Sequence, residues 1–156
     1  MRVHRVVKQG RDPLSVEASR INGGRYNAPG EFGALYCSLE EITATAEVFK
    51  GLRAVGENPA TYPEGSWMLF ELEIQADEVL DLTHEETLAR LGLQPAMLTG
   101  THPEVTQRLG REARDAGYQV ILAPSAAVPG AKNLVLFLDR LSAPPRVLSS
   151  RPTLLS

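Results

Sequence analysis

Gly23-Gly24-Arg25-Tyr26-Asn27-Ala28-Pro29-Gly30 is a turn-forming stretch that carries one arginine and one aromatic ring. Glycine, asparagine and proline favour tight turns, and glycine allows a ligand to approach the backbone closely. The guanidinium of Arg25 can grip a diphosphate through two parallel hydrogen bonds, and Tyr26 can offer a flat ring to a heterocycle. The stretch is a candidate ligand-binding loop, although isolated loop arginines are usually solvated and Tyr26 can equally serve to cover the loop.

A strand and a helix are expected to follow this loop. Residues 33–37 read as a strand that carries Tyr36, and Ser38-Leu39-Glu40-Glu41 reads as a capping box that opens a helix ending near Gly51. Helical spacing places an apolar stripe on one face of that helix, made of Leu39, Ile42, Ala46 and Phe49. Glu47 falls beside this stripe, where a carboxylate needs a partner or water. Lys50, three residues on, is a candidate for an ordinary ion pair, so Glu47 is either structural or catalytic.

The rest of the chain alternates short strands and short helices. Strands are predicted at residues 1–7, 67–75, 79–82, 119–123 and 134–138. Helices are predicted after Thr83 and after Pro103, the second ending at Gly117. Loops are predicted at residues 8–32, 54–66 and 124–133, and an extended tail over the last fifteen residues. In the strand at 67–75, Met68, Phe70, Leu72 and Ile74 should face inward, with Glu71 and Glu73 in water. This order predicts an α+β domain built around antiparallel sheet.

Composition limits the classes of function. The 156 residues suit one domain, and 43% hydrophobic with 22% charged residues is ordinary for a globular protein. A net charge of −3 argues against a broad basic surface for nucleic acid, and the apolar runs are too short for a membrane span. The single cysteine, Cys37, excludes an internal disulfide, and no secretory signal is visible, so we expect a cytoplasmic protein.

Several common chemistries lack their motifs. His4, His84 and His102 are far apart in sequence and lack metal-ligand spacing, so no metal site is expected. No phosphate-binding loop of the GxxxxGK[ST] type and no GxGxxG after a strand is present. Cys37 reads as a small buried hydrophobe, and Ser125 lacks the glycines of a hydrolase nucleophile elbow.

Three short motifs, taken together, resemble the RES-domain family, the toxins of bacterial RES–Xre toxin–antitoxin pairs. The family's arginine, glutamate and serine match Arg25 in Gly-Gly-Arg-Tyr-Asn, Glu47 in Ala-Thr-Ala-Glu-Val and Ser125 in Ala-Pro-Ser-Ala. Residues 130–137, with Asn133, resemble the family's final strand, and residues 106–110 and 116–118 are also similar to it. The likeness covers roughly residues 1–140.

The resemblance implies a single RES domain over residues 1–156, with a core of about 1–140 and an extended tail at 141–156. The expected fold is similar to that of ADP-ribosyltransferases, a split antiparallel sheet with short flanking helices. The expected activity is cleavage of the nicotinamide–ribose bond of NAD by hydrolysis or phosphorolysis. Tyrosine at position 26 departs from many members, in which tryptophan is common, but keeps the aromatic character.

The same resemblance assigns roles to individual residues. Glu47, Arg25 and Ser125 are the expected catalytic residues: Glu47 on the nicotinamide ribose hydroxyls, Arg25 on the diphosphate, Ser125 hydrogen bonding in the same cleft. Tyr26 and Tyr36 are expected to pack against nicotinamide or ribose. Asn133 is a weaker candidate for substrate binding, with fixing the loop before the last strand as its alternative role.

NAD is expected as a substrate rather than a cofactor, and no metal is required. The expected partner is an Xre-like antitoxin that blocks the NAD cleft and carries the DNA-binding surface that this chain lacks. Two alternatives stay open: an ADP-ribosyltransferase that modifies a host protein, and a catalytically silent domain that binds a nucleotide or the antitoxin.

Overall fold

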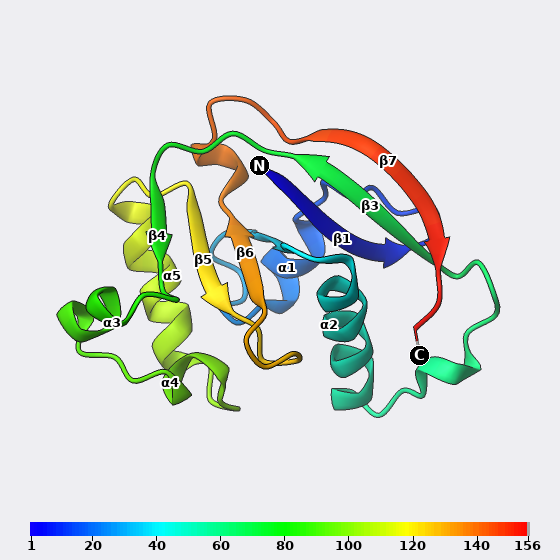
Figure 1. The fold of residues 1–156 in the computed structure, drawn as a ribbon, viewed down its shortest axis with the longest axis horizontal. Coiled ribbons are helices and arrows are strands. Elements are labelled where there is room, and N and C mark those ends of the chain that lie inside the picture. The colour runs from blue at the N-terminus through cyan, green and yellow to red at the C-terminus, as the bar shows by residue number, and fades with distance from the viewer. Residues whose placement is uncertain (156) are drawn as a thin grey trace.

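The computed structural model describes residues 1–155 and contains one seven-stranded sheet. The strand order is β4-β5-β6-β2-β1-β3-β7, and every neighbouring pair is antiparallel except β4 and β5, which are parallel (Figure 1). The strands are β1 (Arg2–Lys8), β2 (Leu35–Ser38), β3 (Trp67–Glu73), β4 (Val79–Asp81), β5 (Val120–Pro124), β6 (Lys132–Leu136) and β7 (Arg146–Thr153). The α+β class is confirmed, with a mixed rather than purely antiparallel sheet.

Five α-helices accompany the sheet among the described residues. They are α1 (Glu17–Asn22), α2 (Glu41–Ala54), α3 (Glu85–Leu91), α4 (Ala96–Thr99) and α5 (Glu104–Asp115), with 3₁₀ turns η1 (Pro59–Thr61) and η2 (Leu138–Arg140). Helix α2 packs against β1 and β2, whereas α3, α4 and α5 gather beside β4 and β5 (Figure 1). Across residues 1–155, no helix has the length and apolar character needed to cross a membrane.

The sheet opens between β1 and β2. The two strands pair at one position among the described residues, His4 with Ser38, whereas β1 pairs with β3 along its whole length. Arg5 bridges the opening, because its Nη1 donates to the carbonyl oxygen of Tyr36 at 2.8 Å and its Nε to that of Pro13 at 2.9 Å. Burial lowers the pKa of Arg5 from its ordinary value, yet both bonds use its charged form. Beyond His4 the edge of β1 is therefore linked to β2 through the Arg5 side chain rather than through backbone pairing.

Three hydrophobic clusters pack against the sheet, and one of them spans both of its halves. Cluster one, under β5, β6 and α5, includes the fully buried Phe137, Ile121 and Leu82. Cluster two, between β1, β2 and β6, includes Leu35 and Leu72. A smaller third cluster packs α2 on β1 and β3 and consists of Val6, Ala44, Leu69 and Leu155, with partly buried neighbours. Because cluster two joins Leu72 of β3 to Leu35 of β2, apolar packing holds the two halves of the sheet together although β1 and β2 pair at one position among the described residues.

Helix α2 corrects two predictions. Its N-cap is Glu40, without a side-chain capping bond, and Ser38 lies in β2, where its Oγ donates to Asn133. The capping box is therefore wrong, because strand pairing holds Ser38 outside the helix. The buried face carries Thr43 and Ala44, and Phe49 packs against the third cluster as the stripe predicted, whereas Ile42 is 70% exposed, so the predicted stripe is only partly correct.

Two segments predicted as irregular contain regular structure. Residues 8–32, predicted as loop, include α1, whose six residues bury no side chain. The tail is extended, as predicted, and forms β7, which pairs with β3 from Arg146 to Thr153. On β3, the predicted inward face is incomplete, because Leu69 on the opposite face is buried by α2.

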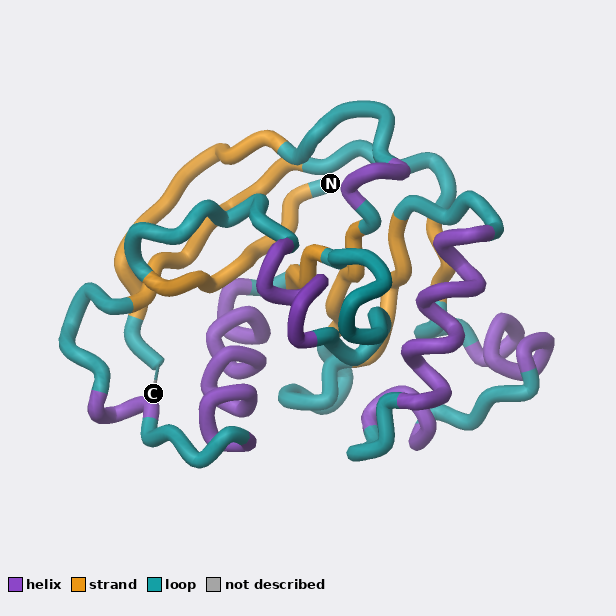
Figure 2. The backbone as a smooth tube through the Cα atoms, turned by 180° about the vertical axis from the view of Figure 1, so that it is seen from behind, coloured by secondary structure: helices purple, strands orange, loops and turns teal. Residues whose placement is uncertain are grey.

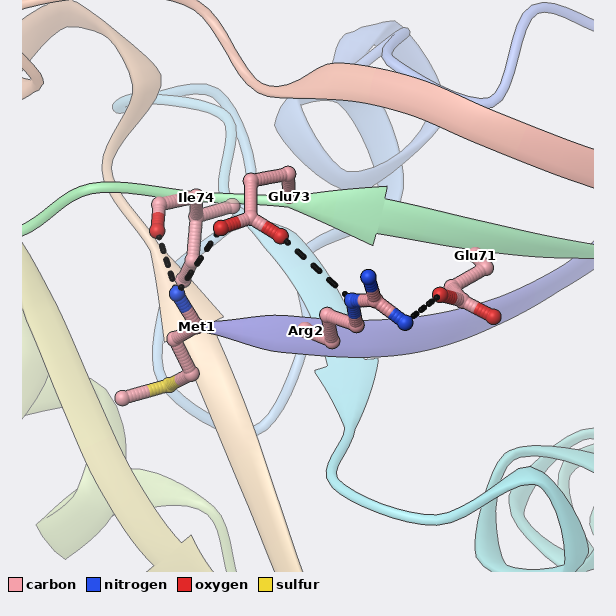
Figure 3. Close-up of polar contacts among 5 residues, drawn as sticks. All are labelled: Met1, Arg2, Glu71, Glu73 and Ile74. Carbon is pink, nitrogen blue, oxygen red and sulfur yellow. Dashed lines mark hydrogen bonds and ion pairs between the residues drawn. The ribbon is translucent and has the colours of Figure 1, made fainter.

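Charged groups tie the start of β1 to the end of β3 (Figure 3). The ammonium of Met1 donates to the carbonyl oxygen of Ile74 at 3.0 Å and lies 3.4 Å from Glu73 Oε1. Arg2 lies 3.4 Å from Glu71 Oε1 and 3.8 Å from Glu73 Oε2. Glu71 and Glu73 are therefore partly exposed, as expected, but paired. Exposed pairs of this kind contribute about 0–1 kcal/mol, so backbone pairing sets this register.

Candidate active site

A cavity of about 340 Å³ lies in the opening between β1 and β2. Four of the predicted residues line it: Arg25 from the glycine-rich turn, Tyr36 from β2, Glu47 from α2 and Asn133 from β6. Its volume falls in the range typical of small-molecule sites. The structure thus brings together side chains that are up to about a hundred residues apart in sequence.

Glu47 is held by one of its two carboxylate oxygens. Oε1 accepts hydrogen bonds from Ser125 Oγ at 2.5 Å, Asn133 Nδ2 at 2.9 Å and the backbone nitrogen of Ala127 at 3.3 Å. Oε2 makes no hydrogen bond to any residue from 1 to 155, and Glu47 lines the cavity. Lys50 donates instead to the carbonyl oxygen of Ala126 at 2.7 Å, so the ordinary Glu47–Lys50 ion pair is not formed. The carboxylate is oriented by neutral donors and keeps one oxygen for a ligand.

Ser125 positions Glu47 from behind the cavity. It is 6% exposed and does not line the cavity itself. Its Oγ accepts from the backbone nitrogens of Ala127 at 3.1 Å and Val128 at 3.0 Å while donating to Glu47. The β5–β6 connection is therefore folded around the same hydroxyl that orients the carboxylate.

Asn133 is oriented in the same way. Its Oδ1 accepts from Ser38 Oγ at 2.7 Å, and its Nδ2 donates to Glu47. Since Asn133 lies in β6 and pairs with Ser38 of β2, strand register fixes the amide. The amide therefore supports the carboxylate and also borders the cavity, which goes beyond the loop-fixing alternative.

The turn that carries Arg25 is fixed by α4 and α5. Arg25 Nη1 donates to the carbonyl oxygens of Leu98 at 3.2 Å and Gly100 at 2.7 Å. Thr106 Oγ1 donates to the carbonyl oxygen of Arg25 at 2.5 Å, and Gln107 Nε2 to that of Gly24 at 3.0 Å. Nε and Nη2 of Arg25 make no hydrogen bond within residues 1–155. The guanidinium is anchored by one nitrogen and has others available to an anion in the cavity.

Close backbone packing explains two glycines near Arg25. A Cβ on Gly110 of α5 would lie 1.8 Å from the carbonyl oxygen of Tyr26. One on Gly24 would lie 2.5 Å from the hydroxyl of Tyr36. Sequence reasoning noted residues 106–110 only as a family likeness. These residues fix the position of the turn: Thr106 and Gln107 bind its backbone carbonyls, and Gly110 allows α5 to pack closely against it.

The two tyrosines predicted to bind substrate lie in different environments: Tyr36 lines the cavity and Tyr26 lies in the core. Tyr36 borders the cavity, and its hydroxyl accepts from the backbone nitrogen of Tyr26 at 2.9 Å and donates to Asn27 Oδ1 at 2.6 Å. Tyr26 is 2% exposed and packs in the first core cluster, outside the cavity lining. Burial raises the pKa of both hydroxyls, so both stay protonated. The position of Tyr26 does not fit the expected packing against substrate, and only Tyr36 stays available for it.

The buried Asn27 side chain holds this loop in place through hydrogen bonds. It is fully buried, and its Nδ2 donates to the carbonyl oxygens of Ser19 at 2.8 Å and Phe32 at 2.9 Å. Together with the bond from Tyr36, every polar atom of the amide is used. The signal available in the sequence was an asparagine inside a glycine-rich turn, which turn chemistry alone explains equally well.

His4 is a cavity residue that sequence reasoning set aside. It lies on β1 opposite Ser38, lines the cavity, and its Nδ1 is buried without a hydrogen-bond partner in residues 1–155. Its distance in sequence from the other motifs left no signal for this placement. Among the described residues, no group of three or more His, Cys, Asp or Glu side chains is arranged to hold a metal ion.

The chain is similar to known proteins in sequence and in fold. The chain is 34% identical over 138 residues to the probable NAD(+) phosphorylase Rv3189 of Mycobacterium tuberculosis, covering 84% of this chain and 62% of that one. It is 29% identical over 120 residues to the NAD(+) phosphorylase MbcT of Mycobacterium bovis, covering 77% and 64%. The chain thus spans less than two thirds of the length of these curated relatives.

A solved structure and a family model complete the comparison. The fold matches a chain in the crystal structure of the M. tuberculosis MbcT–MbcA toxin–antitoxin complex with a TM-score of 0.85, at 24% identity, over 99% of this chain and 84% of that chain. The RES domain model matches residues 1–154, so the likeness extends beyond residue 140 to include β7. The chain belongs to the RES-domain family, as the motifs around Arg25, Glu47 and Ser125 indicated.

Proposed function

We propose that this chain cleaves the nicotinamide–ribose bond of NAD, with phosphate as the favoured acceptor and water as the alternative. The observation that carries the proposal is Glu47, whose Oε1 is saturated by three donors while Oε2 stays free in a cavity that also contains Arg25. Two relatives are named probable NAD(+) phosphorylase and NAD(+) phosphorylase, and these names favour phosphate over water. NAD is in this view a substrate, and the residues act on it without a resident cofactor.

The chemistry needs a negative group beside the reacting sugar. Nicotinamide leaves with the electron pair of the bond between its ring nitrogen and C1 of the ribose, which neutralises the ring and leaves positive charge on the sugar. A phosphate oxygen then forms the new bond to that carbon, or a water oxygen does so and loses a proton. The fixed carboxylate of Glu47 holds the ribose hydroxyls and stabilises the developing cation.

Arg25 and Tyr36 would orient the substrate. The guanidinium nitrogens of Arg25 that the protein leaves unused can bind the diphosphate through charge-assisted hydrogen bonds. Tyr36 presents its ring at the cavity wall, suited to packing against nicotinamide or ribose. Ser125 and Asn133 act by orienting Glu47, so their effect on the reaction passes through its carboxylate.

Product analysis tests the proposal. Purified protein is incubated with NAD, with and without phosphate, and with cell extract, and products are separated by chromatography. ADP-ribose phosphate formed only with phosphate supports phosphorolysis, ADP-ribose supports hydrolysis, and label transferred to protein supports ADP-ribosylation. A folded preparation that leaves NAD intact under all three conditions contradicts the proposal and favours the silent binding domain.

Glu47→Gln provides the matched test of the site. The substitution keeps the shape and an oxygen for Ser125 and Asn133 but removes the charge, so kcat should fall by about 10²- to 10³-fold. Glu41→Gln, at the start of the same helix and paired with Arg151, is the control and should retain activity. If both variants stay active, Glu47 is not the catalytic group. If Glu47→Gln unfolds the protein while Arg25→Ala keeps full activity, Glu47 is structural and the site is misplaced.

We further propose an Xre-like antitoxin that occludes the cavity and binds DNA. Support comes from the structural neighbour, which was solved as a toxin–antitoxin complex. A carboxylate of the antitoxin could occupy the position of the diphosphate at Arg25. Expression of this chain alone should deplete NAD and arrest a bacterial host, and co-expression with the product of the adjacent gene should relieve both. Full NAD turnover by a stable complex would contradict occlusion.

A further inference from the structure

The connection between β5 and β6, residues 125–131, reaches across to α2 (Figure 1). The view from behind shows the same two segments side by side (Figure 2). Ser125 Oγ and the backbone nitrogen of Ala127 donate to Glu47 Oε1, at 2.5 and 3.3 Å. Between them, the carbonyl oxygen of Ala126 accepts from Lys50 Nζ at 2.7 Å. Three consecutive residues of the connection are thus bonded to two side chains of one helix turn.

Lys50 and Glu47 hold the two ends of a single peptide group. The carbonyl of Ala126 and the N–H of Ala127 belong to the same planar unit, so fixing the direction of the carbonyl also fixes the direction of the N–H. Lys50 donates to the carbonyl, and Glu47 shares the N–H with Ser125 Oγ, which lies 3.1 Å away. Half a turn of this peptide would aim the carbonyl oxygen at the carboxylate, where two acceptors repel. Lys50 therefore favours the orientation that gives Glu47 a donor.

The connection itself does little to fix this peptide. Within residues 1–155, Lys50 is the one donor to the carbonyl oxygen of Ala126. The backbone bonds inside the connection are made elsewhere, from Ser125 N to Ala131 O at 2.9 Å and from Ala131 N to Val128 O at 3.1 Å. The side chains on either side of the peptide are single methyl groups, which add little packing. Its orientation consequently depends on the contacts with α2 and with Ser125 Oγ.

Lys50 lies outside the cavity that contains Glu47. It is exposed and lines, with Ala126 and Ala127, a separate cavity of about 490 Å³ on the exposed side of α2. Its ammonium also stays off Glu47 Oε2, the oxygen that the protein leaves for a ligand. Lys50 is therefore placed to act through the connection rather than on a molecule bound in the first cavity.

We propose that Lys50 is a positioning residue for Glu47, which holds the Ala126–Ala127 peptide so that its N–H points at Oε1. The inference rests on the proposed function, in which this carboxylate stabilises the developing sugar cation. A carboxylate already oriented by its donors needs no rearrangement as that charge develops, and such preorganisation acts mainly in the transition state. Loss of the Lys50 bond should therefore lower kcat more than it changes KM.

Three variants test the role of the ammonium in turnover. Lys50→Met keeps the length of the side chain and removes the donor, whereas Lys50→Arg restores a charged donor. Arg53→Met is the matched control, because Arg53 is exposed on the same helix, lines the same cavity and forms no ion pair within residues 1–155. We expect Lys50→Met to lower kcat for NAD about tenfold and to change KM by less than about twofold. Lys50→Arg should recover most of kcat, and Arg53→Met should match the wild type.

A second measurement does not depend on turnover. The resonance of an amide proton that donates to a carboxylate shifts when the carboxylate ionises, because the hydrogen bond strengthens. In protein with isotope-labelled alanine, the Ala127 amide proton should shift across the acid range in which carboxylates titrate, and Glu47→Gln should abolish this shift. Lys50→Met should also lose most of it, whereas Lys50→Arg and Arg53→Met should keep it.

The two measurements separate this inference from the proposed function. If Lys50→Met has the same kcat as Arg53→Met, Lys50 does not position the carboxylate. A lowered kcat with an unchanged Ala127 titration would also overturn the inference, since the loss would then not pass through this peptide. If Lys50→Met loses the Ala127 titration while the wild type never cleaves NAD, the positioning by Lys50 stands and the proposed enzyme activity fails.

Discussion

Ser125 donates a 2.5 Å hydrogen bond to Glu47 although 78 residues separate the two in sequence. The same hydroxyl accepts from two backbone nitrogens of the β5–β6 connection. One small side chain therefore couples the shape of that connection to the orientation of the carboxylate. This coupling explains how a serine outside the cavity lining can matter to chemistry inside it.

Ser125→Ala should weaken both functions of this hydroxyl. Glu47 loses one of its three donors, so kcat should fall about ten- to hundredfold, which corresponds to roughly 1.4–2.7 kcal/mol of barrier. The backbone nitrogens of Ala127 and Val128 lose their acceptor, so the free energy of unfolding should fall by about 1–3 kcal/mol. Steady-state kinetics and denaturant titration measure the two effects. Ser149→Ala, on the exposed β7, is the control, and equal behaviour of the two variants would contradict the coupling.

Gly110→Ala should displace the turn that carries Arg25. The added methyl would meet the carbonyl oxygen of Tyr26 at 1.8 Å, so α5 or the turn must move. Overpacking of this kind costs about 1–3 kcal/mol or more, and we expect kcat/KM for NAD to fall with it. Gly51→Ala on α2 is the matched control, because its Cβ meets nothing within 4 Å. The control should be neutral or stabilising by about 0.5–1 kcal/mol, and a stable, fully active Gly110→Ala would contradict the packing argument.

Local sequence pattern predicted the strands that are apolar and missed the one that is not. Strands β3, β5 and β6 have buried apolar residues, and each was expected within two residues of its observed ends. Strand β7 is almost wholly exposed and contains Pro152, so nothing in its own sequence favours a strand. Its backbone pairing with β3 stabilises it, and pairing between strands that are far apart in sequence produces no pattern in the sequence of either strand.

The sequence predicted which residues form the candidate site, but it did not predict how their side chains contact one another or which of them are buried. Motif resemblance named Arg25, Glu47 and Ser125, and the structure brings Ser125 to Glu47 and lines one cavity with Arg25 and Glu47. Tyr26 shows the limit, since an aromatic residue in a ligand loop and one in the core look the same in sequence. Its ring fills the first core cluster because α5 packs directly on its backbone.

Tyr36→Phe should separate the ring of this tyrosine from its hydroxyl. The ring stays at the cavity wall, but the backbone nitrogen of Tyr26 loses its acceptor and Asn27 Oδ1 loses its donor. We expect the free energy of unfolding to fall by about 1–3 kcal/mol. Tyr118→Phe is the control, since the Tyr118 hydroxyl makes no hydrogen bond within residues 1–155, and it should change stability by less than about 0.5 kcal/mol. Equal stability of the two variants in denaturant titration would show that the buried hydroxyl network is not formed.

Cys37 should make the stability of the fold depend on alkaline pH. Burial raises the pKa of its thiol to about 12, whereas an unfolded cysteine titrates near 8.5. Between these values the unfolded chain loses the proton and the folded chain keeps it, so the unfolded state gains free energy of ionisation and stability falls as pH rises. From pH 8.5 to pH 10 the loss attributable to this thiol should be about 1.6 kcal/mol, because the slope rises from about half of 1.4 kcal/mol per pH unit at pH 8.5 towards that full value at pH 10.

Cys37→Ala isolates this effect. The variant lacks the thiol, so its stability should fall less steeply than that of the wild type between pH 8.5 and pH 10, whatever its stability at neutral pH. Denaturant titrations of both proteins across this interval measure the two slopes. Iodoacetamide gives an independent readout: a 3% exposed, protonated thiol should react at pH 9 only as fast as the chain opens, and at full rate in denaturant. Parallel pH slopes together with rapid alkylation of the native protein would show that Cys37 is accessible and ionised in the fold.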